Sequence, residues 1–547
     1  MRKCVIGIDF GTLSARAVLI DAISGDQLAE STLEYRHAVI ESELPTGKKI
    51  GAGFALQDPE DYLEVLRTVF RKVLSDSGVS KKEVLGLGVD FTTCSLMPTD
   101  EKLIPLSFKE EFKDEPHAYA KLWKHPSAQA EADEITALAK KRGEGWLNIY
   151  GGKISNQFAL PKILETLRKA PTVYDAAKRF IECGDWITSV LTGNENHALA
   201  FAGYKACWNE ESGYPSDEFM TELDPRLHGI VGTKLSEKIS PASEIAGRIS
   251  EYGAELTGLE AGTPVALAVP DAHAALPALN VTEDGDMLFV IGTSTCHIVN
   301  SKEKKTVNGI FGYVKDGIIP GCYTYEAGQC ATGDIFDWFT KNYLPSRYED
   351  EAKERGMSVH ALLREKAAKL RPGESGLIAL DWVGGNRCVL ADADLRGMIL
   401  GMSLRTLPEE IYRAWIEATA FGSKIIVDNY ENSGLKVKSI CAAGGIAVKD
   451  PMLMQIYADV LDKSIRVASS TQAGALGSAM YASVAAGIYE NVTVAAKKLS
   501  PPSTVSYSPI KENVQIYRAL FEEYKTLHDY FGRGENNVMK RLTNNKY

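Results

Sequence analysis

The chain has 547 residues, too many for one hydrophobic core. Its composition, 45% hydrophobic and 24% charged, is typical of soluble globular proteins. Its 61 lysines and arginines against 72 aspartates and glutamates give a net charge of −11, which argues against a nucleic-acid partner. No apolar run reaches the roughly 20 residues of a membrane span, and no signal peptide is recognisable. The nine scattered cysteines lack CxxC spacing. A cytoplasmic protein with two or three domains and no membrane partner is therefore expected.

The N-terminal half begins with a pattern of strands and helices. Residues 4–9 and 15–20 predict two strands around the turn Phe10-Gly11-Thr12. Asp58-Pro59 predicts a helix start, an apolar stripe follows it at helical spacing, and Gly78 marks the helix end. Residues 84–90 predict a further strand. This alternation is typical of a layered α/β architecture.

The opening pattern recurs near the middle of the chain. Residues 287–291 form an apolar run that ends at Gly292-Thr293, as residues 4–9 end at Gly11-Thr12. Two such units suggest two related domains, spanning residues 1–281 and 282–547. The polar segment 109–142 is expected to be a mostly helical insertion that covers the site.

The two Gly-Thr turns are the first candidate site. A glycine turn followed by a hydroxyl residue forms an anion-binding concavity, and Asp9 just before the first turn could hold Mg²⁺ through water. Each turn alone is equally compatible with an ordinary hairpin. Their pairing favours a polyphosphate site, although neither a P-loop nor a dinucleotide-binding fingerprint is present.

Further glycine-rich elements lie near the C-terminal end. Gly444-Gly445 follows an apolar run and precedes a helix that Asp450-Pro451 should begin, a pattern that allows close approach of a phosphate or a flat ring. Ala473-Gly474-Ala475-Leu476-Gly477 begins the next predicted helix.

Together these motifs resemble the FGGY carbohydrate kinases, a family within the actin/hexokinase/Hsp70 superfamily. The resemblance covers residues 4–490 or so. It implies an α/β fold with two actin-like ATPase (ribonuclease H-like) domains flanking a central cleft, the N-terminal one binding sugar and the C-terminal one binding nucleotide. ATP and Mg²⁺ are the implied cofactors, a small sugar is the implied partner, and a homodimer is left open.

Several long stretches resemble the branch of the family that phosphorylates L-ribulose, among them Tyr150-Gly151-Gly152-Lys153-Ile154-Ser155 and Gln455-Ile456-Tyr457-Ala458-Asp459-Val460. The chain departs from that branch at Asn156-Gln157-Phe158, which leaves the fine sugar preference open. D-ribulose, xylulose, pentitol and glycerol kinases are the nearest alternatives. An actin- or Hsp70-like ATPase without sugar transfer is the alternative from another class.

The resemblance also implies roles for individual residues. Asp271, which follows Val269-Pro270 and is expected to cap a helix, matches the family's catalytic base. The sugar-binding residues implied are Thr93, Lys205, Asp271 and Glu326, and the metal-binding residue is Asp9. The nucleotide-binding residues implied are Gly11, Thr12, Gly292, Thr293, Gly333, Gly444, Gly445 and Lys449.

Overall fold

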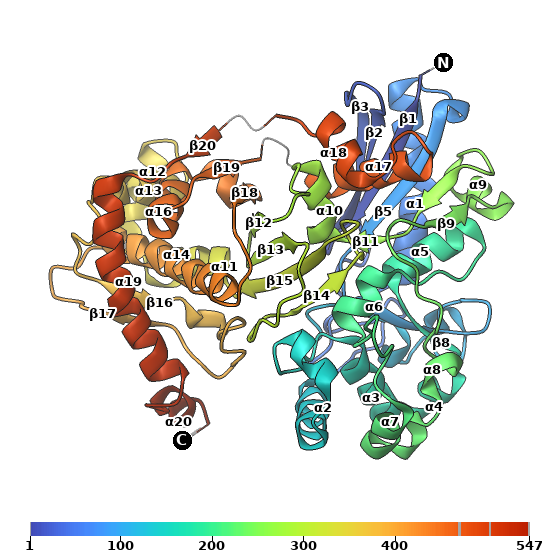
Figure 1. Cartoon of the computed structure of the whole chain (residues 1–547), viewed down its shortest axis with the longest axis horizontal. Coiled ribbons are helices and arrows are strands. Elements are labelled where there is room, and N and C mark those ends of the chain that lie inside the picture. The colour runs from blue at the N-terminus through green and yellow to red at the C-terminus, as the bar shows by residue number, and fades with distance from the viewer. Residues whose placement is uncertain (1, 469–471, 503–504, 545–547) are drawn as a thin grey trace. The chain divides into compact units, whose positions relative to one another are not determined.

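The computed structural model describes residues 2–468, 472–502 and 505–544 (Figure 1). The chain forms two compact units. Unit 1 comprises Met1–Glu283, Gly312–Thr324 and Gln472–Pro501, and unit 2 comprises Asp284–Phe311, Tyr325–Thr471 and Pro502–Tyr547. The first change of unit lies two residues from the expected boundary, but two later segments return to unit 1, which a single boundary does not anticipate.

Unit 1 is built on a mixed sheet with the strand order β3-β2-β1-β5-β10-β9, and β11 also pairs with β5. β1 is antiparallel to β2 and parallel to β5, so the predicted N-terminal hairpin is confirmed. The strands of unit 1 are β1 (Cys4–Phe10), β2 (Ser14–Asp21), β3 (Gln27–Glu34), β4 (Leu56–Gln57), β5 (Val84–Phe91), β6 (Leu96–Thr99), β7 (Ala120–Lys121), β8 (Arg179–Glu182), β9 (Ile245–Arg248), β10 (Pro264–Ala266), β11 (Val269–Pro270) and β14 (Gly312–Lys315).

The first predicted helix is confirmed with both of its ends. α1 begins at Pro59, the Asp58 side chain accepts a hydrogen bond from the N–H of Glu60, and Gly78 ends the helix in the left-handed region at φ 66°. The helices of unit 1 are α1 (Pro59–Ser77), α2 (Gln129–Arg142), α3 (Ala159–Lys169), α4 (Pro171–Ala176), α5 (Cys183–Thr192), α6 (Leu199–Lys205), α7 (Asp217–Leu223), α8 (Ile230–Thr233), α9 (Glu251–Thr257), α10 (Asp271–Ala278), α17 (Ala473–Ala485) and α18 (Val492–Leu499).

One face of the sheet carries α17, which comes from the C-terminal part of the chain and lies beside β1 and β5 in Figure 1. Glycines make this contact. A Cβ added at Gly7 would lie 1.9 Å from the carbonyl oxygen of Ala475, and one added at Gly88 would lie 1.9 Å from that of Ser478. The helix backbone therefore rests directly on the strands, which explains why residues 472–501 belong to unit 1.

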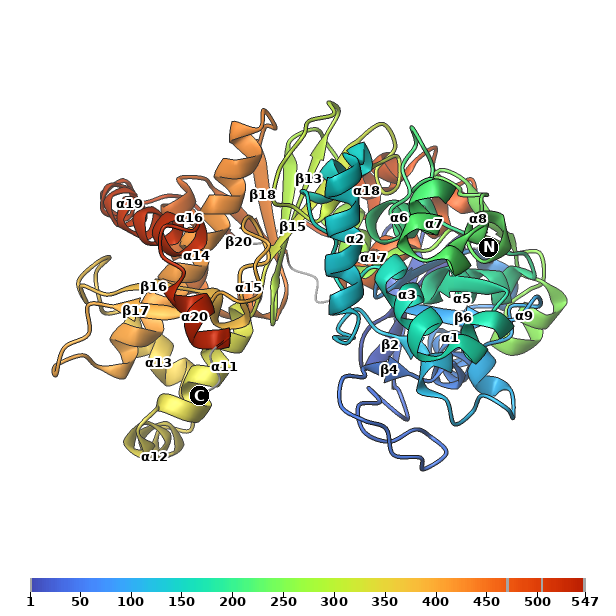
Figure 2. The same cartoon turned by 90° about the horizontal axis from the view of Figure 1, so that it is seen from below.

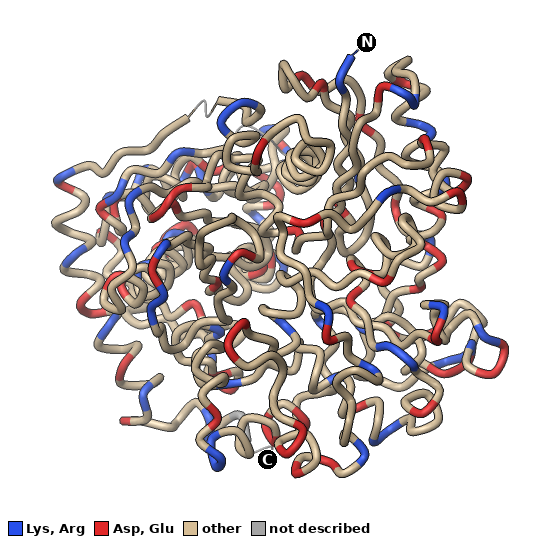
Figure 3. Tube along the Cα trace, turned by 45° about the vertical axis from the view of Figure 1, so that its right-hand side comes forward, with Lys and Arg blue, Asp and Glu red and all other residues tan. Residues whose placement is uncertain are grey.

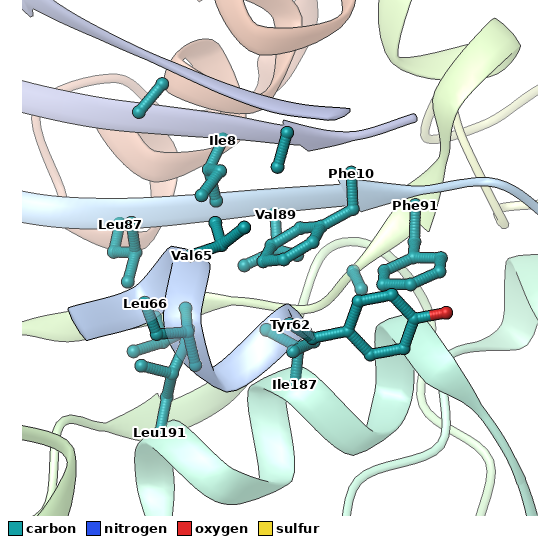
Figure 4. Close-up of a cluster of buried hydrophobic side chains, with 14 of the residues drawn as sticks. Ile8, Phe10, Tyr62, Val65, Leu66, Leu87, Val89, Phe91, Ile187 and Leu191 are labelled. Carbon is teal, nitrogen blue, oxygen red and sulfur yellow. The ribbon is translucent and has the colours of Figure 1, made fainter. Parts of the chain in front are cut away.

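The opposite face of the same strands forms the hydrophobic core (Figure 4). Because side chains alternate along a strand, Ile8 and Phe10 point away from α17 and toward α1 and α5. Phe10 and Phe91 stack with ring centroids 5.2 Å apart, and Tyr62 meets Phe91 edge-on at 5.0 Å. Ile187 on α5 completes this cluster.

The segment 109–142 is less helical than expected. Its last part forms an α-helix, α2, and Pro116–Ala118 form a single 3-10 turn. Ala120 and Lys121 form β7, which pairs with β4 and β6 in a small sheet of order β4-β7-β6-β8. Lys121 is buried there and pairs with Glu165 at 2.7 Å. The polar composition of the segment therefore reflects a buried ion pair and turns as well as an exposed helix.

Unit 2 contains a second mixed sheet in which β15, β13, β12, β18, β19 and β20 are neighbours in that order. β12 is antiparallel to β13 and parallel to β18, as β1 is to β2 and β5 in unit 1. The expected repeat of the N-terminal pattern is therefore confirmed. The strands are β12 (Asp286–Ile291), β13 (Thr295–Ser301), β15 (Tyr323–Gln329, largely in this unit), β16 (Ile378–Leu380), β17 (Met398–Leu400), β18 (Ser439–Ala443), β19 (Ile465–Val467) and β20 (Val505–Tyr507).

The helices of unit 2 include a packed group of α14, α16 and α19, visible together in Figure 2. Asp450 caps α16 by accepting a hydrogen bond from the N–H of Leu453 at 3.0 Å, as its sequence predicts. The helices are α11 (Thr332–Tyr343), α12 (Ser346–Glu354), α13 (Val359–Ala367), α14 (Pro408–Asn432), α15 (Gly445–Lys449), α16 (Pro451–Leu461), α19 (Lys511–Gly532) and α20 (Val538–Asn544).

Acidic and basic residues are interspersed along the trace in Figure 3, in agreement with the dispersed charge of the sequence. The nine cysteines, all within the described residues, form no disulfide. No helix among the described residues is both long enough and apolar enough to cross a membrane.

The contact between α17 and the sheet is testable by adding one methyl group. Gly88→Ala places a Cβ against the backbone of α17, and we expect it to lower the free energy of unfolding by about 3 kcal/mol or more, at the upper end of overpacking costs. Denaturant unfolding measures the loss. Gly145→Ala is the control, because a Cβ there meets no atom within 4 Å. Equal stabilities of the two variants would contradict the close packing.

Candidate active site

Two carboxyl groups lie side by side at the ends of neighbouring strands of unit 1. Asp9 on β1 and Asp90 on β5 are register partners in the parallel pair. Burial raises the pKa of Asp9, although a hydrogen bond with the Asp90 carboxyl group and the positive charge of Arg16 act the other way. Burial raises the pKa of Asp90 further, together with the negative charges of Asp9 and Asp271. This end of the sheet therefore concentrates negative charge in a poorly solvated place.

The first turns of α17 lie against this pair. A Cβ added at Gly474 would lie 3.0 Å from Asp9 Oδ2 and 3.4 Å from Asp90 Oδ1. The hydroxyl of Ser478 donates to Asp90 Oδ2 at 2.7 Å, and the carboxyl groups of Asp9 and Asp90 share a hydrogen bond. The N-terminus of α17 thus faces the two carboxyl groups, an arrangement that the helix dipole favours.

Asp271 lies at the same edge of the sheet. β11 pairs with β5 so that Val269 faces Asp90 and Pro270 faces Phe91, which brings Asp271 level with the residues that follow β5. The expectation that Asp271 caps its helix is wrong by one position. Pro270 is the N-cap, and Asp271 is the first residue of α10, with Oδ1 accepting from the N–H of Ala272 at 2.7 Å. The carboxylate is still at the helix N-terminus.

Of the expected sugar-binding residues of this unit, Lys205 is buried and Thr93 is half-buried. The hydroxyl of Thr93, three residues after Asp90, is buried without a hydrogen-bond partner. Lys205 is the last residue of α6 and is 3% exposed, so it is not the surface lysine that its sequence context equally allowed. Its ammonium group lies 5.5 Å from the ring centre of Phe158.

The first Gly-Thr turn is held by its own hydrogen bonds. The N–H of Gly11 donates to the carbonyl of Ser14 at 3.0 Å. The hydroxyl of Thr12 accepts from Trp123 Nε1 at 3.2 Å, and its carbonyl accepts from Gln57 Nε2 at 2.7 Å. The amide of Gly11 is therefore used to close the turn, so phosphate binding there would have to share it.

Unit 2 brings three of its expected nucleotide-binding residues together. The N–H of Gly333, in the first turn of α11, donates to the carbonyls of Gly292 and Thr293 at 3.0 Å each. A Cβ at Gly333 would lie 2.5 Å from the oxygen of Gly292, so a glycine is needed for this contact. As in unit 1, the first glycine of the turn closes it, since Gly292 N–H donates to Ser294 at 2.9 Å.

Gly444 and Gly445 lie at the end of β18, the parallel neighbour of β12. Gly444 has φ 99°, and a Cβ there would lie 2.3 Å from the carbonyl oxygen of Ile291. Gly445 begins α15, is exposed, and has open space where a Cβ would point. The second Gly-Thr turn and the Gly-Gly pair therefore share one edge of the sheet. Lys449 lies at the far end of α15 with an exposed side chain.

Glu326 is placed on β15 in unit 2 and is 7% exposed. Its negative charge raises the pKa of Cys388, after the larger effect of burial. Lys205 belongs to unit 1, and the expected partnership of Glu326 with it stays a prediction.

Asp90, Ser478 and Glu182 belong to this region and were not singled out from the sequence. A signal for Asp90 was present, because Gly7-Ile8-Asp9 and Gly88-Val89-Asp90 share one Gly-x-Asp pattern at the ends of two strands. Within residues 2–468, 472–502 and 505–544, no group of three or more His, Cys, Asp or Glu side chains is arranged to hold a metal ion. A metal at Asp9 would therefore need other ligands, such as water or phosphate.

Comparison with known proteins gives near-complete matches along the chain. A protein from Halalkalibacterium halodurans named "Ribulokinase" is 50% identical over 545 residues, 99% of this chain and 97% of the relative. One of the same name from Bacillus licheniformis is 47% identical over 535 residues, 97% of each chain.

Solved structures show the same fold at lower identity. Xylulose kinase from Rhodospirillum rubrum has a TM-score of 0.78 at 22% identity, covering 96% of this chain and 98% of its own. Gluconate kinase from Lactobacillus acidophilus has a TM-score of 0.80 at 19% identity, covering 98% and 99%. The N-terminal domain of the FGGY family of carbohydrate kinases matches residues 4–277, and its C-terminal domain matches residues 287–486. The chain therefore belongs to the FGGY family of carbohydrate kinases.

Proposed function

We propose that this kinase transfers the γ-phosphoryl group of ATP to L-ribulose and forms L-ribulose 5-phosphate, a step of L-arabinose catabolism. The observation that most strongly supports this substrate is the 47–50% identity over nearly the whole chain to proteins named "Ribulokinase". D-ribulose and ribitol-type pentitols are secondary candidates, because residues 156–158 differ from the pattern of the L-ribulose branch.

Asp271 is proposed as the base that accepts the proton of the sugar hydroxyl. Its position at the start of α10 supports the ionised form that a base needs at the outset. Thr93 and Lys205 are proposed to bind the sugar, since an unpartnered buried hydroxyl and a buried ammonium both favour a polar ligand. Glu326 is proposed to accept further sugar hydroxyls.

The nucleotide is proposed to bind at both glycine-rich edges. Gly11 and Thr12 in unit 1 and Gly292, Thr293 and Gly333 in unit 2 would approach the phosphates. Gly444 and Gly445 are proposed to lie against the adenosine, which the open space at Gly445 supports. Lys449 is the least supported of these residues, because its exposed side chain has an ordinary explanation as a solvated lysine.

Mg²⁺ fits the acidic end of β1 and β5. This hard ion takes oxygen ligands, keeps several waters and needs only one or two carboxylates from the protein. Asp9 and Asp90 offer such oxygens on neighbouring strands, where both carboxyl groups are buried and close together. Asp9 is proposed as the principal metal-binding residue. When bound, the ion would neutralise charge on the phosphates.

The proposed substrate is tested by measuring ADP release with a panel of sugars. We expect kcat/KM to be highest for L-ribulose, with lower values for D-ribulose and ribitol. Xylulose, glycerol and gluconate are the comparison substrates from the rest of the family. A higher kcat/KM for any of these would replace L-ribulose. ATP hydrolysis that no sugar stimulates would favour an ATPase without sugar transfer.

The role of Asp271 is tested by Asp271→Asn. We expect kcat to fall by about 10³-fold, within the usual range for loss of a general base, while ATP affinity measured by calorimetry is retained. Asp217→Asn is a matched control, because Asp217 is also the first residue of a helix, α7, but is not a site residue. Wild-type turnover in Asp271→Asn would remove this residue from the proposal.

The strand-end carboxyl pair predicts a dependence of stability on pH. The pKa of Asp90 is well above its ordinary value of 3.8. Between the ordinary pKa and the raised one, the folded chain binds a proton that the unfolded chain has lost, so stability falls as pH rises. Asp90→Asn should remove that fall and raise the free energy of unfolding at pH 7. Thermal unfolding from pH 4 to 8 measures it.

Asp26→Asn, at an exposed turn, is the control for this experiment and should keep the wild-type pH profile. Added Mg²⁺ should stabilise the wild type more than Asp90→Asn, because it offsets the repulsion between the two carboxylates. Parallel pH profiles for all three proteins would show that the pair is not coupled to stability.

A further inference from the structure

The turn that follows β5 has an unusual backbone. Cys94 has φ 62°, in the left-handed region that a residue with a Cβ rarely adopts. Such a conformation costs on the order of 1–3 kcal/mol and persists only where its surroundings enforce it. The preceding residue is Thr93, whose buried hydroxyl lacks a partner. Whatever holds Cys94 in this conformation also fixes the direction of the Thr93 side chain.

Glu182 is one of the groups that hold this turn. It is the last residue of β8, which pairs with β6 so that Glu182 faces Leu96. Although it stands at the N-cap of α5, its side chain makes no capping hydrogen bond. Its Oε2 instead accepts from the N–H of Ser95 at 3.0 Å, and the N–H of Cys94 also lowers the pKa of this carboxyl group.

Lys162 on α3 holds the turn from the carbonyl side. It is fully buried, and its ammonium group donates to the carbonyl oxygens of Cys94 and of Leu122, the latter at 2.8 Å. The peptide units around Cys94 are thus held by a carboxylate at their N–H groups and by an ammonium at a carbonyl. Charge-assisted hydrogen bonds of this kind are stronger than neutral ones.

Glu182 is also influenced by Lys205, the other sugar-binding residue proposed in unit 1. The positive charges of Lys162 and Lys205 both lower the pKa of Glu182. The carboxylate thus contacts the turn that carries Thr93 by a hydrogen bond, and it acts on Lys205 through its charge. The titratable groups around Glu182 are Lys162 on α3, Lys205 on α6, Cys94 in the turn, and Cys183 and Asp185 on α5.

We propose that Glu182 is a positioning residue for the sugar, which fixes Thr93 through the Cys94–Ser95 backbone and places a negative charge where it acts on Lys205. This inference rests on the proposed function, because it assigns these two residues to the sugar. It extends that function, because Glu182 itself is not assigned a contact with the sugar. Affinity for the sugar, and not for ATP, is the property that Glu182 controls.

The ionisation of Glu182 makes this control depend on pH. Burial raises the pKa of Glu182 to about 7, against the effects of the two lysines and the backbone N–H groups. Above about pH 7 the carboxylate is charged and attracts Lys205. Below it the carboxyl group is neutral and this attraction is lost, so KM for the sugar should rise as the pH falls from 8 to 6.

The experiment compares Glu182→Gln with the wild type, using whichever sugar of the panel the wild type phosphorylates best. At pH 8 we expect KM for that sugar to rise about 10-fold, as for the loss of one hydrogen bond to a charged group, with KM for ATP unchanged and kcat within about 2-fold. KM for the sugar in Glu182→Gln should no longer vary between pH 6 and 8. Glu182→Asp, which keeps the charge, should restore part of the affinity and the pH dependence.

Glu165→Gln is the matched control for a merely structural role. Glu165 is also a buried carboxylate, but it is bound by Lys121, Lys169, His125 and Ser127 and not by the turn. We expect it to lose thermal stability and to keep the wild-type KM for the sugar. An unchanged sugar KM in Glu182→Gln, or an equal rise in Glu165→Gln, would overturn the inference.

The outcomes also separate this inference from the proposed substrate. If another sugar proves best, L-ribulose is rejected while Glu182 is still tested with that sugar. If Glu182→Gln does not fold, the wild type alone decides, because a sugar KM that is constant from pH 6 to 8 overturns the role of Glu182. If no sugar is phosphorylated, both proposals fall.

Discussion

The direct contact between the backbone of α17 and two strands is the constraint on which unit 1 depends. Gly7 and Gly88 leave no side chain between the strands and the helix, so the carbonyl oxygens of Ala475 and Ser478 occupy the space where a Cβ would be. The alternation of side chains along β1 and β5 then decides which residues face α17 and which face the core. The residues two positions further along, Asp9 and Asp90, face the same helix, whereas Ile8 and Val89 face the hydrophobic core.

That arrangement also explains the electrostatics of the site. Carboxylates at the end of a buried sheet are poorly hydrated, which raises their pKa values, and two of them side by side repel each other. The N-terminus of α17 and the hydroxyl of Ser478 offset part of this cost. The close packing of Gly7 and Gly88 against α17 therefore places both carboxyl groups where their pKa values are raised.

Local sequence patterns predicted the local structure well. The hairpin of β1 and β2, both ends of α1, the cap of α16 and the repeat at β12 follow from apolar periodicity and capping residues, which act over a few positions. The errors have a different origin. Segment 109–142 looked helical because it is polar, yet Lys121 is buried in a strand by its ion pair with Glu165, a partner 44 residues away.

The candidate site was predicted only in part, because some of its residues carry local sequence signatures and others are defined by contacts between distant segments. The turns and Asp9 carry local signatures, and the family resemblance supplied Thr93, Lys205, Asp271 and Glu326. Glu182 resembles an ordinary helix N-cap in sequence, and only the fold shows that its carboxylate turns toward Ser95. Asp90 could have been found, because its Gly-x-Asp pattern repeats that of Asp9. Contacts between distant segments, such as Ser478 with Asp90, leave no local trace.

The late position of α17 in the chain has a consequence for how the protein is made. During synthesis from the N-terminus, the first 283 residues emerge long before Gln472–Pro501, which complete their unit. Until then one face of the central sheet, with Gly7, Gly86 and Gly88, lacks its covering helix, and the growing chain exposes a surface open to wrong pairing. Unit 1 can complete its fold only after Gln472–Pro501 have been synthesised, long after its first strands.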